Sequence, residues 1–221
     1  MSIQKGKLLL AALLASAVAT PAMAAAGDTY VRVRGIVVAP NEKSGGILPG
    51  LPNETVKVDN AVVPEVDITQ MVTDNIGFEL IAATSKHAVS GVSGTTGGIG
   101  KLASTWVLPP TLTAQYHLMP DAKVRPYVGA GVNYTLFYSE KASSAFEAAA
   151  GNTNVKLKSS FGWAAQAGID IDLNEKMFLN LDVKYIDINT KGTLVTTGLG
   201  TQTVKVNLDP IVVGVGIGFR L

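Results

Sequence analysis

The C-terminal segment, residues 209–221, constrains the fold more than any other stretch of the chain. From Val213 onward every second residue is large and apolar, ending with Phe219 and Leu221, and the residues between them are three glycines and Arg220. Successive side chains of a β-strand point to opposite faces, so this alternation predicts a strand with one apolar face and one small or charged face. The apolar face would cover a core in a soluble protein, or contact lipid in a membrane barrel.

The N-terminus has the three parts of a secretory signal peptide. Lys5 and Lys7 form a basic region, residues 8–18 form an apolar run, and residues 22–24 form an Ala-Met-Ala cleavage site. The alternative interpretation is a membrane anchor, but the run is shorter than the roughly 20 residues that a spanning helix needs. We therefore expect residues 1–24 to be a signal peptide and residues 25–221 to form one domain.

Composition excludes several classes of protein. The chain has no cysteine, which excludes a disulfide-stapled scaffold and any thiol metal site. Its 18 Lys and Arg nearly balance 17 Asp and Glu, so there is no electrostatic case for nucleic acid as a partner. No later stretch holds 18 consecutive apolar residues, so a membrane span would require a closed β-barrel. We expect no metal and no cofactor.

Segments with a period of two recur along the chain, separated by turn-forming residues. There are eight of them, at 29–38, 62–72, 76–86, 105–118, 125–138, 158–173, 177–188 and 204–221. Their connections alternate between long and short; the long ones include 40–53, 87–104, 139–154 and 189–202, and 139–154 is expected to contain a helical turn or two. This layout predicts an all-β fold, an eight-stranded antiparallel transmembrane β-barrel with short periplasmic turns and long extracellular loops. A soluble eight-stranded barrel needs no such segregation of loop lengths.

One face of the predicted strands carries no charge, as contact with outer-membrane lipid requires. Leu80, Val132 and Leu181 are typical members of this face. An Arg or Lys there would cost about 2–4 kcal/mol at the middle of the bilayer. Trp106 and Trp163 lie near strand ends, where an aromatic girdle is expected.

The opposite face predicts a lumen with two different halves. The periplasmic half carries charges of both signs, which should pair because an eight-stranded barrel is just wide enough for its own side chains and burial without pairing is costly. The residues of this predicted charge plug are Arg32, Arg34, Glu65, Asp67, Glu79, Arg125, Asp170, Asp172, Asp182, Lys184 and Arg220.

The extracellular half of the lumen is predicted to be apolar, lined by Ile36, Val38, Ile81, Val107, Phe137, Ile186, Leu208 and Val212. Two interpretations remain: these side chains pack solid, or they surround a pocket suited to small hydrophobic molecules. Since the plug would block direct passage, a ligand would have to leave sideways into lipid. Pro210 is the candidate for a lateral opening, because a strand proline removes a ladder hydrogen bond.

Two stretches give the chain a family resemblance: Leu-Pro-Pro-Thr-Leu-Thr-Ala-Gln-Tyr-His at 108–117 and Pro-Tyr-Val-Gly-Ala-Gly-Val-Asn-Tyr-Thr at 126–135. With Asp209-Pro210 and the closing Gly-Phe-Arg-Leu, they resemble the OmpW family of small outer-membrane proteins, to which the AlkL-type alkane importers are related. The resemblance implies an eight-stranded barrel with an apolar channel for the uptake of small hydrophobic compounds. One departure is Leu221, where the family usually ends in an aromatic residue; the barrel assembly machinery, an implied partner, reads this terminal strand.

Rival functions have weaker support. Ser85, His87 and Ser90 suggest an acyl-transfer site, but no acidic residue is placed in the sequence to orient the histidine, so a polar loop mouth is the preferred interpretation and we expect no enzyme. Residues 97–101 lack the spacing of a phosphate-binding loop. The remaining alternative is a non-transporting structural or stress-tolerance barrel, or a surface receptor that acts through its loops.

Overall fold

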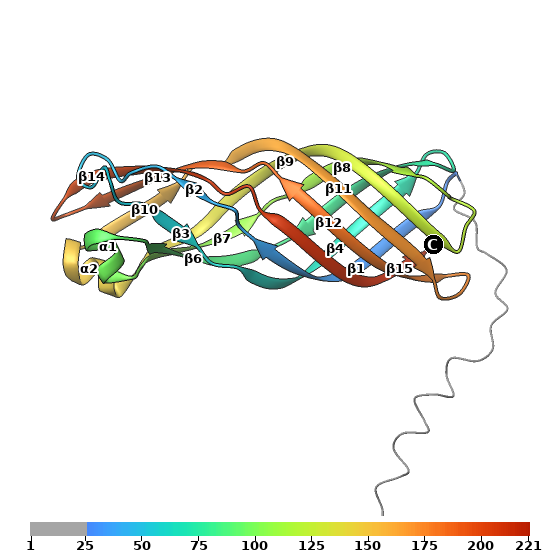
Figure 1. The fold of residues 1–221 in the computed structure, drawn as a ribbon, viewed down its shortest axis with the longest axis horizontal. Coiled ribbons are helices and arrows are strands. Elements are labelled where there is room, and N and C mark those ends of the chain that lie inside the picture. Colours follow the sequence, from blue (N-terminus) through green and yellow to red (C-terminus); the bar gives the residue numbers. More distant parts are fainter. Residues whose placement is uncertain (1–25) are drawn as a thin grey trace, which may run out of the picture.

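The computed structural model describes residues 26–221, so the expected signal peptide lies outside the described residues. Eight strands close into an antiparallel barrel in which β15 pairs back onto β1, as in the pair Val31 and Phe219 (Figure 1). In order around the barrel they are β1 (Thr29–Ala39), β4 (Ala61–Met71), β5 (Ile76–Ala83), β8 (Thr111–His117), β9 (Val124–Ala142), β11 (Ser160–Asp172), β12 (Met177–Ile186) and β15 (Ile211–Arg220). The predicted fold class is confirmed.

The long connections extend the barrel wall at one end of the molecule, which we call the long-loop end; the other is the short-turn end (Figure 1). One extension joins β3 (Val56–Val58), β6 (Ser85–Gly91) and β7 (Lys101–Leu108) to the upper part of β9. The other is a four-stranded sheet of β10 (Thr153–Leu157), β13 (Asn189–Thr196), β14 (Gly200–Asn207) and β2 (Lys43–Ser44). Two short helices, α1 (Gly94–Ile99) and α2 (Ser144–Ala150), lie at this end.

Two of the predicted loops are therefore wrong. Residues 87–104 contain parts of β6 and β7, and residues 189–202 contain β13 and the start of β14. Residues 189–202 are rich in threonine, which is typical of loops in composition but is β-branched and favours strands. In residues 87–104 the two threonines and most of the glycines lie in α1, and other residues form the strands on either side. The helical turn expected within 139–154 is confirmed by α2, whose first turn is capped by the Ser143 side chain accepting a hydrogen bond from the Phe146 amide at 3.1 Å.

Two predicted strands, 105–118 and 204–221, are also interrupted where prolines fall. Pro109 and Pro110 separate β7 from β8, and Asp209 and Pro210 lie between β14 and β15. A proline lacks the N–H that the ladder needs, so each strand bends out of register at these points. The interruptions mark the level at which the barrel passes into its extensions.

The outer face of the barrel strands is apolar and exposed. Val33, Leu80 and Val215 are each about half exposed, as expected for side chains that contact lipid. Trp163 lies against Tyr185, with ring centroids 5.0 Å apart, as part of the expected aromatic girdle. Among residues 26–221, no helix combines the length and the apolar composition needed to traverse a bilayer.

The glycine face of β15 makes room for the lumen side chains. A Cβ atom at Gly216 would lie 2.1 Å from the Val33 carbonyl oxygen, and one at Gly218 would lie 2.1 Å from the Phe178 ring. The alternation first seen in the sequence therefore has two causes, lipid on one side and close packing of the lumen on the other.

Candidate functional site

The lumen near the short-turn end is filled by an ion network centred on two arginines of β1. The Arg32 guanidinium donates to Asp67, Thr69 and Asp170 at 2.7–3.0 Å. Arg34 lies 2.8 Å from Glu65 and 2.7 Å from Asp67. Both arginine side chains are fully buried, so this part of the lumen is sealed.

The remaining plug residues extend the network across the barrel. Lys184 donates to Glu65 at 3.0 Å and to Asp182, while Arg125 pairs with Asp172. Arg220 lies at the rim, where its side chain keeps 11% exposure and its Nε is 3.5 Å from Asp28. The structure thus places ten of the eleven predicted plug residues in the buried lumen: Arg32, Arg34, Glu65, Asp67, Glu79, Arg125, Asp170, Asp172, Asp182 and Lys184.

An elongated cavity lies directly above this plug, toward the long-loop end. Its volume is about 100 Å³, well above the ~10–15 Å³ that a single water molecule occupies on this measure. The Glu65–Lys184 ion pair forms part of its floor. Its wall includes all eight predicted lining residues: Ile36, Val38, Ile81, Val107, Phe137, Ile186, Leu208 and Val212.

The cavity continues upward into the strand extensions, which the sequence did not reveal as part of the lumen. Several apolar side chains from β3, β6, β10 and β14 line it, namely Val56, Val58, Val89, Leu157, Val204 and Val206. A second cavity of about 50 Å³ shares part of this wall. Beyond it, Ile47, Leu102 and Phe146 pack into an apolar cluster at the long-loop end. Val204 and Val206 belong to the predicted strand 204–221, on the same face as Leu208, so its alternation was the available signal for them.

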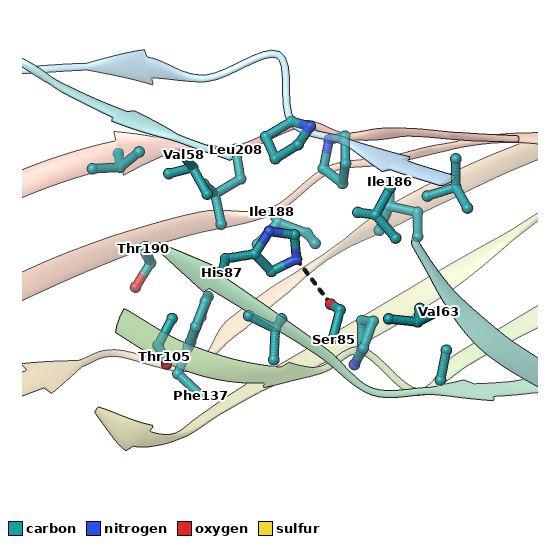
Figure 2. A pocket seen from close by; sticks show the side chains of 18 of the residues that line it. Val58, Val63, Ser85, His87, Thr105, Phe137, Ile186, Ile188, Thr190 and Leu208 are labelled. Carbon is teal, nitrogen blue, oxygen red and sulfur yellow. Dashed lines mark hydrogen bonds between the residues drawn. The ribbon is translucent and has the colours of Figure 1, made fainter. Parts of the chain in front are cut away.

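A polar pair faces into the cavity from β6. Ser85 Oγ lies 2.9 Å from His87 Nε2, and both residues keep only 5% exposure (Figure 2). The other imidazole nitrogen, Nδ1, is 2.8 Å from the Asp59 carbonyl oxygen and 3.8 Å from the Asp59 carboxylate. The group that orients His87 is therefore a backbone carbonyl, while the Asp59 carboxylate accepts from the Ala88 amide at 2.6 Å and makes no hydrogen bond to the imidazole. The preferred interpretation of a polar loop mouth is wrong, because the pair is buried in the cavity wall.

The barrel wall is interrupted beside the cavity in two places. Next to Pro210, which lines the cavity, the ladder is reduced to isolated bonds such as Ile186 N–H to the Pro210 carbonyl at 3.2 Å. A longer interruption lies between β4 and β6, above the pair Glu65 and Ala83. Within residues 26–221, no backbone hydrogen bond joins these strands until Asp59 N–H meets the Ala88 carbonyl at 3.2 Å.

The site offers nothing that would hold a metal. In the described part of the chain, no group of three or more His, Asp or Glu side chains is arranged to bind a metal ion. The cavity therefore has a sealed ionic floor and an apolar wall with a few hydroxyl groups and one imidazole. The backbone hydrogen bonding of this wall is interrupted in two places.

Comparisons with known proteins agree with this architecture. The sequence profile of the OmpW family matches residues 25–221. Outer membrane protein W of Escherichia coli (strain K12) is 37% identical over 197 residues, which covers 88% of this chain and 89% of that protein. The crystal structure of the outer membrane protein OprG from Pseudomonas aeruginosa aligns with a TM-score of 0.83 at 34% identity, covering 89% of this chain and 97% of that one.

A further solved structure shares the fold alone. The solid-state NMR structure of outer membrane protein AlkL in DMPC lipid bilayers aligns with a TM-score of 0.69 at 24% identity. The alignment covers 94% of this chain and 96% of that chain. The same fold is thus seen in a protein studied in lipid bilayers.

Proposed function

Since the chain belongs to the OmpW family, we propose that it passes small hydrophobic molecules from the cell exterior into the outer membrane. Family membership makes it a non-enzymatic barrel, embedded in the lipid of the Gram-negative outer membrane. The long-loop end is accordingly extracellular and the short-turn end periplasmic. The observation that carries the proposal is the apolar cavity lying directly on a sealed ionic floor.

The cavity suits an apolar molecule better than a polar one. Its wall is dominated by Val, Ile, Leu, Phe and Pro side chains, which can offer contact but few hydrogen bonds. A polar solute would lose its hydration there without replacement, at a cost of roughly 1–3 kcal/mol for each unsatisfied group.

The proposed exit is lateral, because the plug closes the axis of the barrel. An apolar solute gains nothing by crossing the buried arginines and carboxylates, whereas the lipid beside the wall is an apolar solvent. Pro210 is one candidate for the exit, since few ladder bonds have to be broken there. The longer interruption between β4 and β6 is a second candidate.

The test is the uptake of a fluorescent hydrophobic solute into liposomes that carry the purified protein. We expect uptake well above that of empty liposomes, and a fall to near the empty-liposome rate in Val212→Asp and Ile186→Asp, which place a carboxylate in the cavity wall. Leu199→Asp is the matched control, because Leu199 is exposed near the tip of the β13–β14 hairpin. Phe146→Ala should raise uptake by loosening the outer cluster, a gain that misfolding cannot mimic.

The alternative is a structural barrel or a receptor that acts through its loops. It predicts that folded Val212→Asp and Phe146→Ala variants take up the solute at the wild-type rate. That result, with heat-modifiable gel mobility showing intact barrels, would refute the transport proposal.

A further inference from the structure

We propose that Ser85 and His87 form a hydrogen-bond-accepting subsite that selects hydrophobic molecules carrying one hydroxyl group over alkanes and ketones of the same length. The inference deepens the proposed function and rests on it, since it names the class of solute that the cavity prefers. It comes from the direction of each hydrogen bond in the cavity wall.

The partners of His87 fix its tautomer. Nδ1 lies 2.8 Å from the Asp59 carbonyl oxygen, and a carbonyl can only accept, so Nδ1 carries the proton. In the neutral imidazole Nε2 is then an acceptor, and the Ser85 hydroxyl donates to it across 2.9 Å (Figure 2). Asp59 also accepts from the Ala88 amide at 2.6 Å through its carboxylate, which holds this turn against β6.

The Ser85 oxygen is left with unused acceptor capacity. A hydroxyl group has one proton and two lone pairs, and the only Ser85 proton goes to His87. No hydrogen bond to the Ser85 oxygen from another described side chain accompanies it, and Ser85 lines the cavity at 5% exposure. A buried acceptor of this kind fits a ligand that donates.

The other hydroxyl groups of the wall also donate their protons to acceptors within the protein. Thr105 donates to the Trp106 carbonyl at 3.1 Å, and Thr190 donates to the Lys158 carbonyl at 2.6 Å. Thr111 donates to the Pro109 carbonyl at 2.9 Å. Every hydroxyl proton on the cavity wall therefore points into the protein, and the Lys184 ammonium in the floor donates to Glu65 and Asp182. The hydroxyl groups of the wall can accept hydrogen bonds from a ligand and give none.

Because the wall hydroxyl groups accept hydrogen bonds but do not donate them, the cavity should bind ligands that differ by one functional group with different affinities. An alcohol brings an O–H that the Ser85 oxygen can accept, whereas a ketone brings only an acceptor and an alkane brings neither. One net hydrogen bond corresponds to roughly a fivefold difference in affinity. The apolar chain of all three ligands would contact the same Val, Ile and Leu side chains.

Histidine NMR reports the interaction directly, because the chain has only two histidines. His117 is buried in the plug near the short-turn end and serves as the internal reference. In nanodiscs at pH 8.5, titration of [¹⁵N-His]-protein with decan-1-ol should shift the His87 ring nitrogens and leave His117 unchanged. Decan-2-one and n-decane at equal membrane concentrations should shift His87 far less.

Uptake into liposomes supplies the functional arm. We expect decan-1-ol to enter about fivefold faster, relative to n-decane, through wild-type protein than through Ser85→Ala, with Ser85→Thr retaining the preference. Ser90→Ala is the matched control, because Ser90 lies on the same strand outside the cavity wall. His87→Phe frees the Ser85 proton, so decan-2-one should then enter about as fast, relative to n-decane, as decan-1-ol does.

The outcomes separate this inference from the proposed function. Equal His87 shifts with all three ligands, or a Ser85→Ala variant that keeps the alcohol preference, would overturn the subsite while leaving transport intact. If no solute enters faster than through empty liposomes, transport fails; a His87 shift specific to decan-1-ol would then still establish the subsite as a binding site.

Discussion

Replacing Arg32 by methionine is the most direct test of the sealed plug. Arg32 is fully buried and donates to Asp67, Thr69 and Asp170. Methionine fills much of the same volume but brings no charge, so both carboxylates lose a partner while remaining out of water. The barrel should therefore be strongly destabilised rather than merely rearranged.

The magnitude follows from the burial of these contacts. Removing one partner from a buried ion pair costs about 3–5 kcal/mol, mainly because the other charge is left uncompensated. That is roughly a hundredfold to several thousandfold in the folding equilibrium. Arg220→Met is the matched control: at the rim its nearest carboxylates are 3.5 and 3.9 Å away, and the loss should be below about 1 kcal/mol.

Reversible urea unfolding in lipid vesicles, followed by the fluorescence of the two tryptophans, gives the free energies. The double variant Arg32→Met, Asp170→Asn should recover part of the loss, since the amide removes one orphaned charge. Equal costs for Arg32→Met and Arg220→Met, or no recovery in the double variant, would refute the claim that the network is held by buried ion pairing.

Two further predictions concern packing and the extracellular end. Gly218→Ala should destabilise the barrel by about 1–3 kcal/mol because its Cβ would meet the Phe178 ring at 2.1 Å, whereas Gly35→Ala, with open space outside, should be near neutral in the same urea titration. Hydrogen bonds from the Thr96 side chain and backbone lower the pKa of Glu54 below its ordinary value of 4.5, so this carboxylate stabilises the loop at neutral pH and the stabilisation is lost as the pH falls through that lowered pKa. The protection factor of the Thr96 amide, which is the intrinsic exchange rate divided by the observed rate, should fall in acid in the wild type and should be low already at neutral pH in Glu54→Gln. A protection factor that does not change with pH in the wild type would contradict this account.

The strand extensions of the barrel were not predicted from the sequence. Residues 189–202 were expected to form a loop, yet they pair as β13 and β14 and help to enclose the lumen. Short polar strands outside the bilayer carry no lipid-facing pattern, so their pairing is decided by neighbours rather than by hydrophobic alternation. Val204 and Val206, by contrast, lie in the predicted strand 204–221 on the face of Leu208, and the structure adds them to the cavity wall.

The sequence by itself determined the faces of the barrel. A period of two fixes which side chains point together, and lipid tolerates no charge, so the lipid face and the composition of the two lumen halves follow from the residues alone. Only the tertiary structure decided which side chains contact each other across the lumen. Arg32 reaches Asp170, and Asp59 reaches His87, because barrel closure and register bring distant segments together, and local patterning has no information about either.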